Sequence, residues 1–310
     1  MLSKIVILGP TASGKTDLAT ELAKSTDSEI ISADSRQCYK YLDIGTAKPT
    51  PEQLQVVPHY NISILNPDEY DSAALFKERA DKWTSEILKR KHHVIYCGGS
   101  TLHLRGLIQP FDDIPPSNEK NLELLESKLK HKGEEYLLNE LAETDPGYLQ
   151  KIDGFNKQRI FRALDVYMQT GKPFSSFHSG HSVIPPDDMI VIGLHYPRKK
   201  LYNRINARVI RMVESGLVEE TKSVLEKGYS SQAQSLQTVG YRQVIEHLDE
   251  KLSFGQMVAD IQTQTRRYAK RQITWFRRWK FIEWIDVDQL TVSEQLKSVE
   301  QKLAAKLQKG

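Results

Sequence analysis

The sequence of 310 residues has few cysteines and no long apolar run. Its two cysteines, Cys38 and Cys97, are too few for a disulfide framework, and they suggest no metal site. No apolar stretch reaches the length of a membrane span, and the first residues lack the charged start, apolar stretch and cleavage site of a signal peptide. We therefore expect a protein of the reducing cytoplasm with no membrane partner.

A large excess of charge of one sign is also missing. The formal net charge is +3 and the sequence pI is about 8.6, so the chain is only mildly basic. The hydrophobic content of 39% and the charged content of 27% are typical of a globular protein with a real core. The length suits two domains, or one domain that carries an insertion.

A phosphate-binding motif is present near the amino end. Residues 9–16 fit G-x-x-x-x-G-K-[ST], directly after an apolar segment and directly before a helical pattern, which is the context that the motif requires. The backbone N–H groups of such a loop and the helix N-terminus form an anion pocket, to which Lys15 adds a charge and Thr16 a hydroxyl for Mg²⁺. A chance match on an ordinary loop is the alternative. The predicted diphosphate- or nucleotide-binding residues are Gly9, Pro10, Thr11, Ala12, Ser13, Gly14, Lys15 and Thr16.

Short apolar runs alternate with helical patterns, which predicts a parallel α/β sheet. The expected strands are residues 4–8, 29–32, 94–97 and 189–194. Residues 115–186 differ, because they show only helical patterns between two Pro-rich connections. We therefore expect a P-loop NTPase-like core of residues 1–114 and 187–310, with residues 115–186 inserted as an all-helical domain. The expected helices span residues 72–90, 119–131, 134–142, 157–170, 199–215, 218–227 and 256–278.

Polar residues follow two of the expected strands. Asp34 comes just after residues 29–32, at the edge of an open α/β sheet where ligands bind, so it is a candidate general base or metal ligand. An equally good interpretation is that Asp34 caps the next segment. The strand at residues 94–97 ends in Cys97 and two glycines, and lacks the acid that P-loop ATPases place there. Ser100 and Thr101 follow with hydroxyls, although a plain Gly-rich turn is the alternative.

Basic residues concentrate near the carboxyl end. No acidic residue lies between Asp260 and Glu283, whereas a solvated helix would alternate charges. The interleaved basic and aromatic residues favour nucleic-acid contact over a merely basic surface, and we expect Arg267 and Arg271 to contribute, with most aromatics in the core. The basic residues of this segment are Arg266, Arg267, Lys270, Arg271, Arg277, Arg278 and Lys280.

Two further arginines, Arg204 and Arg208, lie four positions apart on an expected helix and so share a face. They could clamp phosphate oxygens, but a solvated helix face is the other interpretation.

In their order along the chain, these motifs resemble the tRNA dimethylallyltransferases, also called tRNA isopentenyltransferases. The resemblance spans nearly the whole length, and it is specific because so many motifs occur together. The matching segments are residues 9–16, 34–37, 43–49, 58–60, 98–100, 158–167, 171–173, 239–241 and 264–272.

The resemblance implies a reaction. The exocyclic amine of the adenosine 3′ to the tRNA anticodon would attack dimethylallyl diphosphate, and diphosphate would leave. The P-loop would then hold the leaving group rather than ATP, with Mg²⁺ on Thr16 as cofactor. The implied partners are the tRNA anticodon stem-loop and dimethylallyl diphosphate, and we expect a monomer of bacterial type with no obligate protein partner.

The resemblance also implies roles for single residues. Asp34 would accept the amine proton, Ser100 would supply a catalytic hydroxyl, and Arg208, with Arg204 as the alternative, would hold the diphosphate. The residues that it implies in tRNA binding are Asp34, Ser35, Arg36, Gln37, Ser100, Thr101, Gln158, Arg159, Ile160, Phe161 and Arg162.

Three positions depart from the family pattern. Ser100 stands where threonine is common, with Thr101 next, so either hydroxyl could serve. His103 replaces a common tyrosine, and residues 153–156 replace the usual His-Pro-Asn-Asp. A small-molecule or nucleoside kinase that uses ATP, an RNA-stimulated ATPase and a tRNA-binding module with a purely structural P-loop remain the alternatives.

Overall fold

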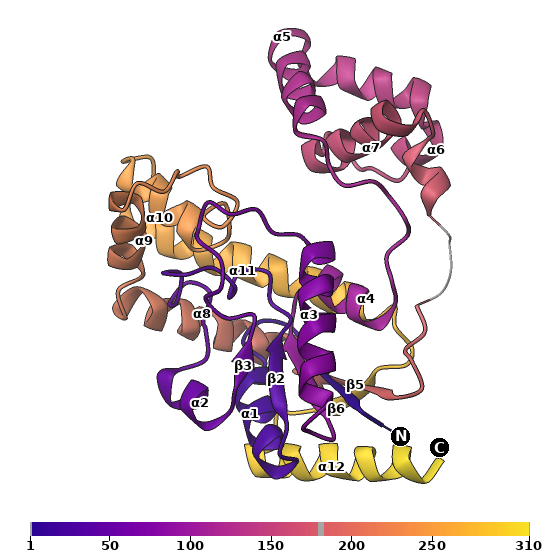
Figure 1. Cartoon of the computed structure of the whole chain (residues 1–310). Coiled ribbons are helices and arrows are strands. Elements are labelled where there is room, and N and C mark those ends of the chain that lie inside the picture. The colour runs from indigo at the N-terminus through magenta and orange to yellow at the C-terminus, as the bar shows by residue number, and fades with distance from the viewer. Residues whose placement is uncertain (1, 179–182, 310) are drawn as a thin grey trace. The chain divides into compact units, whose positions relative to one another are not determined.

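The computed structural model describes residues 2–178 and 183–309 (Figure 1). The chain forms two compact units, one of Met1–Gln109 with Val183–Gly310 and one of Pro110–Ser182. These limits differ from the expected 115 and 186. Ile114 packs against the core of the second unit and Val183 packs against the core of the first. The first connection therefore belongs to the insertion, and the end of the second connection belongs to the main unit.

The first unit is built on a parallel sheet of six strands in the order β3-β2-β4-β1-β5-β6. The predicted parallel α/β architecture is confirmed. The two edge strands were not predicted, because β3 has only two residues and β6, Glu283–Asp286, begins and ends with an acidic residue instead of forming an apolar run. The strands are β1 (Lys4–Leu8), β2 (Glu29–Ser32), β3 (His59–Tyr60), β4 (Val94–Gly98), β5 (Met189–His195) and β6 (Glu283–Asp286).

Helices cover both faces of the sheet, because alternate strand residues point to opposite sides. Ile5 and Ile7 face α1 (Lys15–Ser25) and α12 (Val292–Lys309). Val6 and Leu8 face α3 (Ala73–Leu88), α4 (Thr101–Ile108) and the end of α11 (Phe254–Phe276). Both faces are apolar, which explains why the inner strands read as continuous apolar runs.

A separate cluster lies beside the sheet. There α8 (Arg198–Glu214), α9 (Leu217–Glu226), α10 (Tyr241–Leu248) and α11 pack around Tyr39 and Leu42, from the long segment that follows β2. The segment continues into the short helix α2 (Pro51–Val56). Buried side chains therefore hold the segment after β2 in place, which matters because it lines the site described below.

The second unit has its own core, built by α5 (Glu119–Thr144), α6 (Pro146–Leu149), α7 (Lys157–Thr170) and the 3₁₀ turn η1 (Phe174–Phe177). Gly133 interrupts α5 with a left-handed φ of 82°, which a glycine adopts without a steric penalty. The break agrees with the two helices expected on either side of it. Among the described residues, none of the helices combines the length and apolarity that a membrane span requires.

Candidate active site

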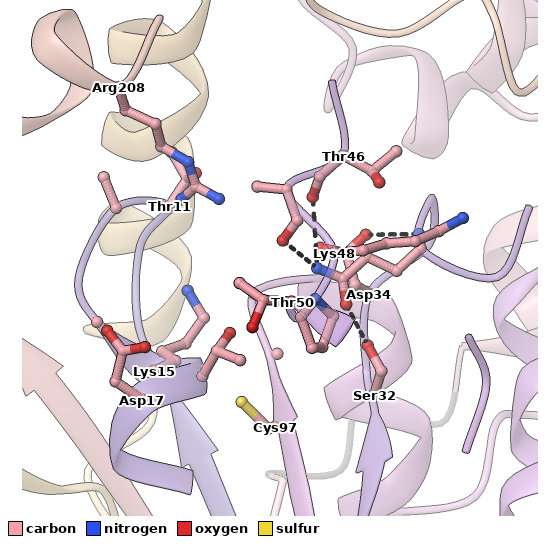
Figure 2. Close-up of a pocket in the computed structure, with 18 of the residues that line it drawn as sticks. Thr11, Lys15, Asp17, Ser32, Asp34, Thr46, Lys48, Thr50, Cys97 and Arg208 are labelled. Carbon is pink, nitrogen blue, oxygen red and sulfur yellow. Dashed lines mark hydrogen bonds between the residues drawn. The ribbon is translucent and has the colours of Figure 1, made fainter. Parts of the chain in front are cut away.

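The carboxyl ends of β1, β4 and β2 open onto a cavity of about 770 Å³ (Figure 2). These three strands are neighbours and parallel, so the segments that follow them meet at one edge of the sheet. The cavity brings together the P-loop and Asp34, both expected from the sequence. Its lining includes Thr11–Asp17, Asp34, Gln37, Asp43, Ile44, Thr46–Pro51, Cys97–Gly99, Arg204, Arg208, Arg211, Tyr268 and Gln272.

Two helices from the carboxyl-terminal part of the unit hold the P-loop in shape. Arg204 Nε donates to the carbonyl of Ala12 at 2.9 Å, and Ala12 has a left-handed φ of 63°. The Thr11 N–H donates to Gln272 Oε1 at 2.9 Å, and Gln272 Nε2 donates to the Gly99 carbonyl at 2.8 Å. Gln272 thus connects the P-loop to the turn after β4. A Cβ on Gly99 would lie 2.4 Å from Gln272 Nε2, so a side chain at this position would displace the Gln272 amide.

Positive and unpaired groups line the P-loop side of the cavity (Figure 2). Lys15 Nζ donates to the Pro10 carbonyl at 2.8 Å, and burial lowers the pKa of Lys15 to about 8. Burial also lowers the pKa of Arg208, although a guanidinium stays charged. Ser13 Oγ is buried and has no hydrogen-bond partner among the described residues. Since a buried polar atom normally has a partner, this hydroxyl fits a site that receives an anion.

The strand-end acid that is typical of P-loop ATPases is missing from the structure too. Cys97 lines the cavity at the end of β4, and burial raises the pKa of its thiol to about 12. The thiol is therefore neutral and does not replace a carboxylate. Asp34, on the other side of β4, is the carboxylate at this edge that faces the cavity from a neighbouring strand.

Asp34 has the capping role, one of the two that the sequence left open, and the catalytic role stays a prediction. Its Oδ1 accepts hydrogen bonds from the N–H groups of Arg36 at 2.9 Å and Gln37 at 3.3 Å, which fixes the turn after β2. In the part of the chain that the structure describes, hydrogen bonds reach only this oxygen of the carboxylate. Oδ2 is left to receive a proton or a ligand.

The neighbours of Asp34 are engaged with the protein itself. Gln37 is buried, its Nε2 donates to the carbonyls of Thr46 and Ala47, and its Oε1 accepts from Ser32 Oγ at 2.8 Å. A contact from Gln37 to a base would require these bonds to break, because both ends of the amide are occupied. Gln37 instead holds the cavity wall in place through its bonds to Ser32, Thr46 and Ala47. Arg36 Nη1 donates to the Ser35 carbonyl at 3.0 Å, and both residues are half-buried.

The predicted hydroxyls, Ser100 and Thr101, begin α4, and neither belongs to the described cavity lining. Ser100 is buried, and its Oγ lies 3.3 Å from Nδ1 of His103, the residue that departs from the family pattern. Burial lowers the pKa of His103 to about 3, so the imidazole stays neutral. The Ser100 hydroxyl is therefore directed at a neutral ring, whereas Thr101 is half-exposed.

The insertion residues on α7 divide by burial. Gln158 and Arg159 are exposed, but Ile160 and Phe161 lie in the core of the second unit. Arg162 Nη2 donates to the Pro115 carbonyl at 2.6 Å, and Nη1 lies 3.3 Å from the buried carboxylate of Asp165. The side chains of Ile160, Phe161 and Arg162 are thus used inside the unit, whereas those of Gln158 and Arg159 are open to solvent, and tRNA contact by this segment stays a prediction. The motif is amphipathic, so only one side of the helix reaches solvent.

The basic segment of α11 and the turn after it has an exposed face. Arg267 and Arg271 are exposed, and the Arg271 guanidinium lies 5.8 Å from the centre of the Tyr268 ring. Phe276 and Trp279 are buried against the sheet, as expected for most of these aromatics. Neither arginine forms an ion pair with an acidic side chain in the described chain, which leaves this face free to neutralise phosphates.

Comparison with known proteins decides the family. The family model described as "IPP transferase" matches residues 37–279, more than half of the chain. The chain belongs to the IPP transferase family. The predicted family and enzyme class, a prenyltransferase, are thereby confirmed, and the kinase alternative is not favoured.

Individual relatives agree with membership in the IPP transferase family. A tRNA dimethylallyltransferase of Acetivibrio thermocellus is 43% identical over 294 residues, 94% of each chain. The solved tRNA isopentenylpyrophosphate transferase of Bacillus halodurans is 34% identical, with a TM-score of 0.74 over 100% of this chain and 98% of that one. A eukaryotic dimethylallyltransferase solved acting on tRNA is 26% identical with a TM-score of 0.79, and 77% of its chain is covered. These likenesses also confirm the predicted P-loop fold.

Sequence reasoning about this IPP transferase missed Gln272 and Tyr268 as residues of the cavity. Both lie in a segment that the sequence presents as an RNA surface. The available signal was Gln272 itself, because Ala269, Gln272 and Phe276 share a buried face and a glutamine is unusual there. Residues 43–49, most of which line the cavity, were likewise matched as a motif but given no role.

Proposed function

We propose that the chain transfers the dimethylallyl group of dimethylallyl diphosphate to the exocyclic amine of the adenosine 3′ to the anticodon in tRNA, and that it releases diphosphate. The observation that carries the proposal is a cationic P-loop cavity in which the strand-end position of an ATPase acid is occupied by Cys97. Such a cavity suits an anion that departs rather than a phosphate that water attacks. The names of the relatives support the substrates.

The P-loop side would hold the diphosphate. Its ligands would be the backbone N–H groups at the start of α1, the free hydroxyl of Ser13, the ammonium of Lys15 and the guanidinium of Arg208. Negative charge grows on the diphosphate as the C–O bond breaks, so donors fixed in this place stabilise the transition state more than the ground state.

Thr16 would hold Mg²⁺ together with oxygens of the diphosphate. The site fits this ion, because Mg²⁺ commonly takes one or two protein ligands alongside substrate phosphates and does not require a cluster of acids. No group of three or more His, Cys, Asp or Glu side chains able to hold a metal occurs among the described residues. Bound Mg²⁺ would supply positive charge to the leaving group.

Asp34 would serve as the general base. The amine nitrogen of adenosine forms the new N–C bond, the C–O bond to diphosphate breaks, and the amine proton moves to Asp34 Oδ2. The two hydrogen bonds at Oδ1 keep the carboxylate in one orientation for this transfer. The target base has to leave the anticodon loop and enter the cavity, as in other enzymes that modify a base.

Contacts with tRNA outside the cavity would come from the exposed residues Arg267 and Arg271 on α11 and from Gln158 and Arg159 on α7. Base-independent phosphate contacts of this kind orient an RNA without reading its sequence. We further propose a cytoplasmic protein that acts as a monomer.

A double-label assay tests the proposal. The protein is incubated with labelled dimethylallyl diphosphate or with labelled ATP, with and without unmodified tRNA. We expect the five-carbon label to enter the tRNA and the ATP label to remain in ATP. Consumption of ATP without any prenylation of tRNA would refute the proposed function and favour a kinase or an ATPase.

A further inference from the structure

Two sequence motifs that have no role so far, residues 43–49 and residues 239–241, meet at one carboxylate. This carboxylate belongs to Glu220, on α9. Glu220 Oε2 accepts hydrogen bonds from the N–H groups of Asp43 at 2.9 Å and Ile44 at 2.8 Å. Glu220 Oε1 accepts from the N–H of Gly45 at 3.2 Å and from the hydroxyl of Tyr241 at 2.6 Å. Three consecutive backbone donors and one phenol therefore share a single side chain.

Packing between the two motifs is as close as their hydrogen bonding. Tyr241 is fully buried, and a Cβ on Gly45 would lie 2.5 Å from its ring. Only glycine at position 45 lets the loop approach the ring and reach the carboxylate. Burial and the charge of Glu220 raise the pKa of Tyr241, so its hydroxyl remains a donor.

The loop held in this way lines the cavity. Asp43, Ile44, Thr46 and Lys48 are lining residues, and Figure 2 shows Thr46 and Lys48 opposite Lys15 and Arg208. On its inner side the loop accepts hydrogen bonds from Gln37 at the carbonyls of Thr46 and Ala47. The loop is therefore fixed from two directions, by Gln37 from within the site and by Glu220 from outside it.

We propose that Glu220 is a positioning residue that keeps residues 43–48 in the conformation that receives the target nucleotide, without itself touching a substrate. The proposal rests on the proposed function for the identity of that nucleotide. A carboxylate suits the task because two oxygens offer enough lone pairs for four donors, whereas an amide offers one oxygen and adds two N–H groups that face other donors. Loss of the carboxylate would let the loop leave its place, and tRNA would then bind only the fraction of molecules with the loop in place.

The test compares Glu220→Gln with Glu219→Gln, a change at the exposed neighbouring residue of the same helix. We expect Glu220→Gln to weaken tRNA binding and raise the KM for tRNA about 10- to 100-fold, with the affinity for inorganic diphosphate at the P-loop unchanged. Hydrogen exchange of the amides of residues 43–45 should rise in Glu220→Gln alone. An equal loss of tRNA and diphosphate affinity, or normal exchange with normal tRNA binding, would overturn the proposal.

Chemical rescue provides an independent test. Glu220→Ala removes one methylene and the carboxylate, which together have the size of acetate. Added acetate, but not chloride at equal ionic strength, should restore tRNA affinity and slow the exchange of residues 43–45 in this variant. If Glu220→Ala does not fold, Tyr241→Phe, which removes one donor, should raise the exchange to a smaller extent. If acetate does not rescue Glu220→Ala and exchange does not rise in Tyr241→Phe, the positioning role of Glu220 is refuted. Neither measurement requires turnover, so this outcome can be distinguished from failure of the double-label assay.

Discussion

Binding of dimethylallyl diphosphate should weaken as the solution becomes alkaline, because the P-loop lysine loses its charge early. Burial lowers the pKa of Lys15 from its ordinary 10.5 to about 8, with the Arg208 charge acting in the same direction. The charged, binding-competent form therefore predominates below about pH 8 and is lost as the pH rises through that value. From roughly pH 7 to pH 9, its population falls from about nine-tenths to about one-tenth. If binding requires that form, the dissociation constant rises about 10-fold.

Calorimetry without tRNA measures this effect directly. A phosphate monoester loses its second proton near a pKa of about 6, so the charge of the ligand should change little over the range. Lys15→Arg is the matched control, because a guanidinium stays charged and its affinity should not vary with pH. Near the pKa, the wild-type protein should also take up protons from the buffer on binding, since the bound anion stabilises the ammonium.

Two results would refute the reasoning about Lys15. A wild-type dissociation constant that is the same at both pH values would mean that the lysine does not titrate in this range. A 10-fold loss that also occurs in Lys15→Arg would mean that another group, in the ligand or in the protein, carries the pH dependence.

Three further changes test the remaining parts of the site. Asp34→Asn should lower the single-turnover rate roughly 10²- to 10⁴-fold while tRNA affinity stays nearly unchanged, as measured by rapid quench and filter binding. Replacement of both Arg267 and Arg271 by Gln should weaken binding of every tRNA, and should reduce the salt dependence of binding by about one unit for each lost phosphate contact. Gln272→Leu leaves two backbone groups without partners and should cost about 2–4 kcal/mol of unfolding free energy in denaturant titrations, together with diphosphate affinity.

Each of these three predictions would be contradicted by a specific result. A normal single-turnover rate in Asp34→Asn would show that Asp34 is not the general base. An unaltered salt dependence of binding would show that Arg267 and Arg271 do not contact tRNA phosphates. A Gln272→Leu protein with wild-type stability and diphosphate affinity would show that the connection between the P-loop and the turn after β4 is dispensable.

The sequence predicts the inner sheet and the P-loop because both depend on local patterns. Four apolar runs give β1, β2, β4 and β5, and a motif with fixed spacing gives residues 9–16. The short strand β6 has no such pattern, since its place is set by pairing with β5. The segment after β2 carries little periodicity either, because buried contacts of Tyr39 and Leu42 with distant helices determine its course.

The site itself is predicted only in part, and the reason is again distance along the chain. Asp34 could be placed because strand ends converge in a parallel sheet. The roles of Gln272 and Glu220 could not be predicted, because most of their hydrogen-bond partners lie far away in sequence. A single polar residue in a helical pattern gives no information about which residue it contacts. Ile160 and Phe161 were included with the tRNA contacts because the motif was read as a unit, whereas helix geometry turns them into the core.

The hydrogen bond between Thr11 and Gln272 spans 261 positions of the chain. During translation, the P-loop leaves the ribosome long before the helix that completes it has been synthesised. A nascent or prematurely terminated chain that lacks α11 would therefore carry the whole glycine-rich motif and still have an unfinished binding loop. We expect that such fragments neither sequester the isoprenoid donor nor compete with the finished enzyme for it.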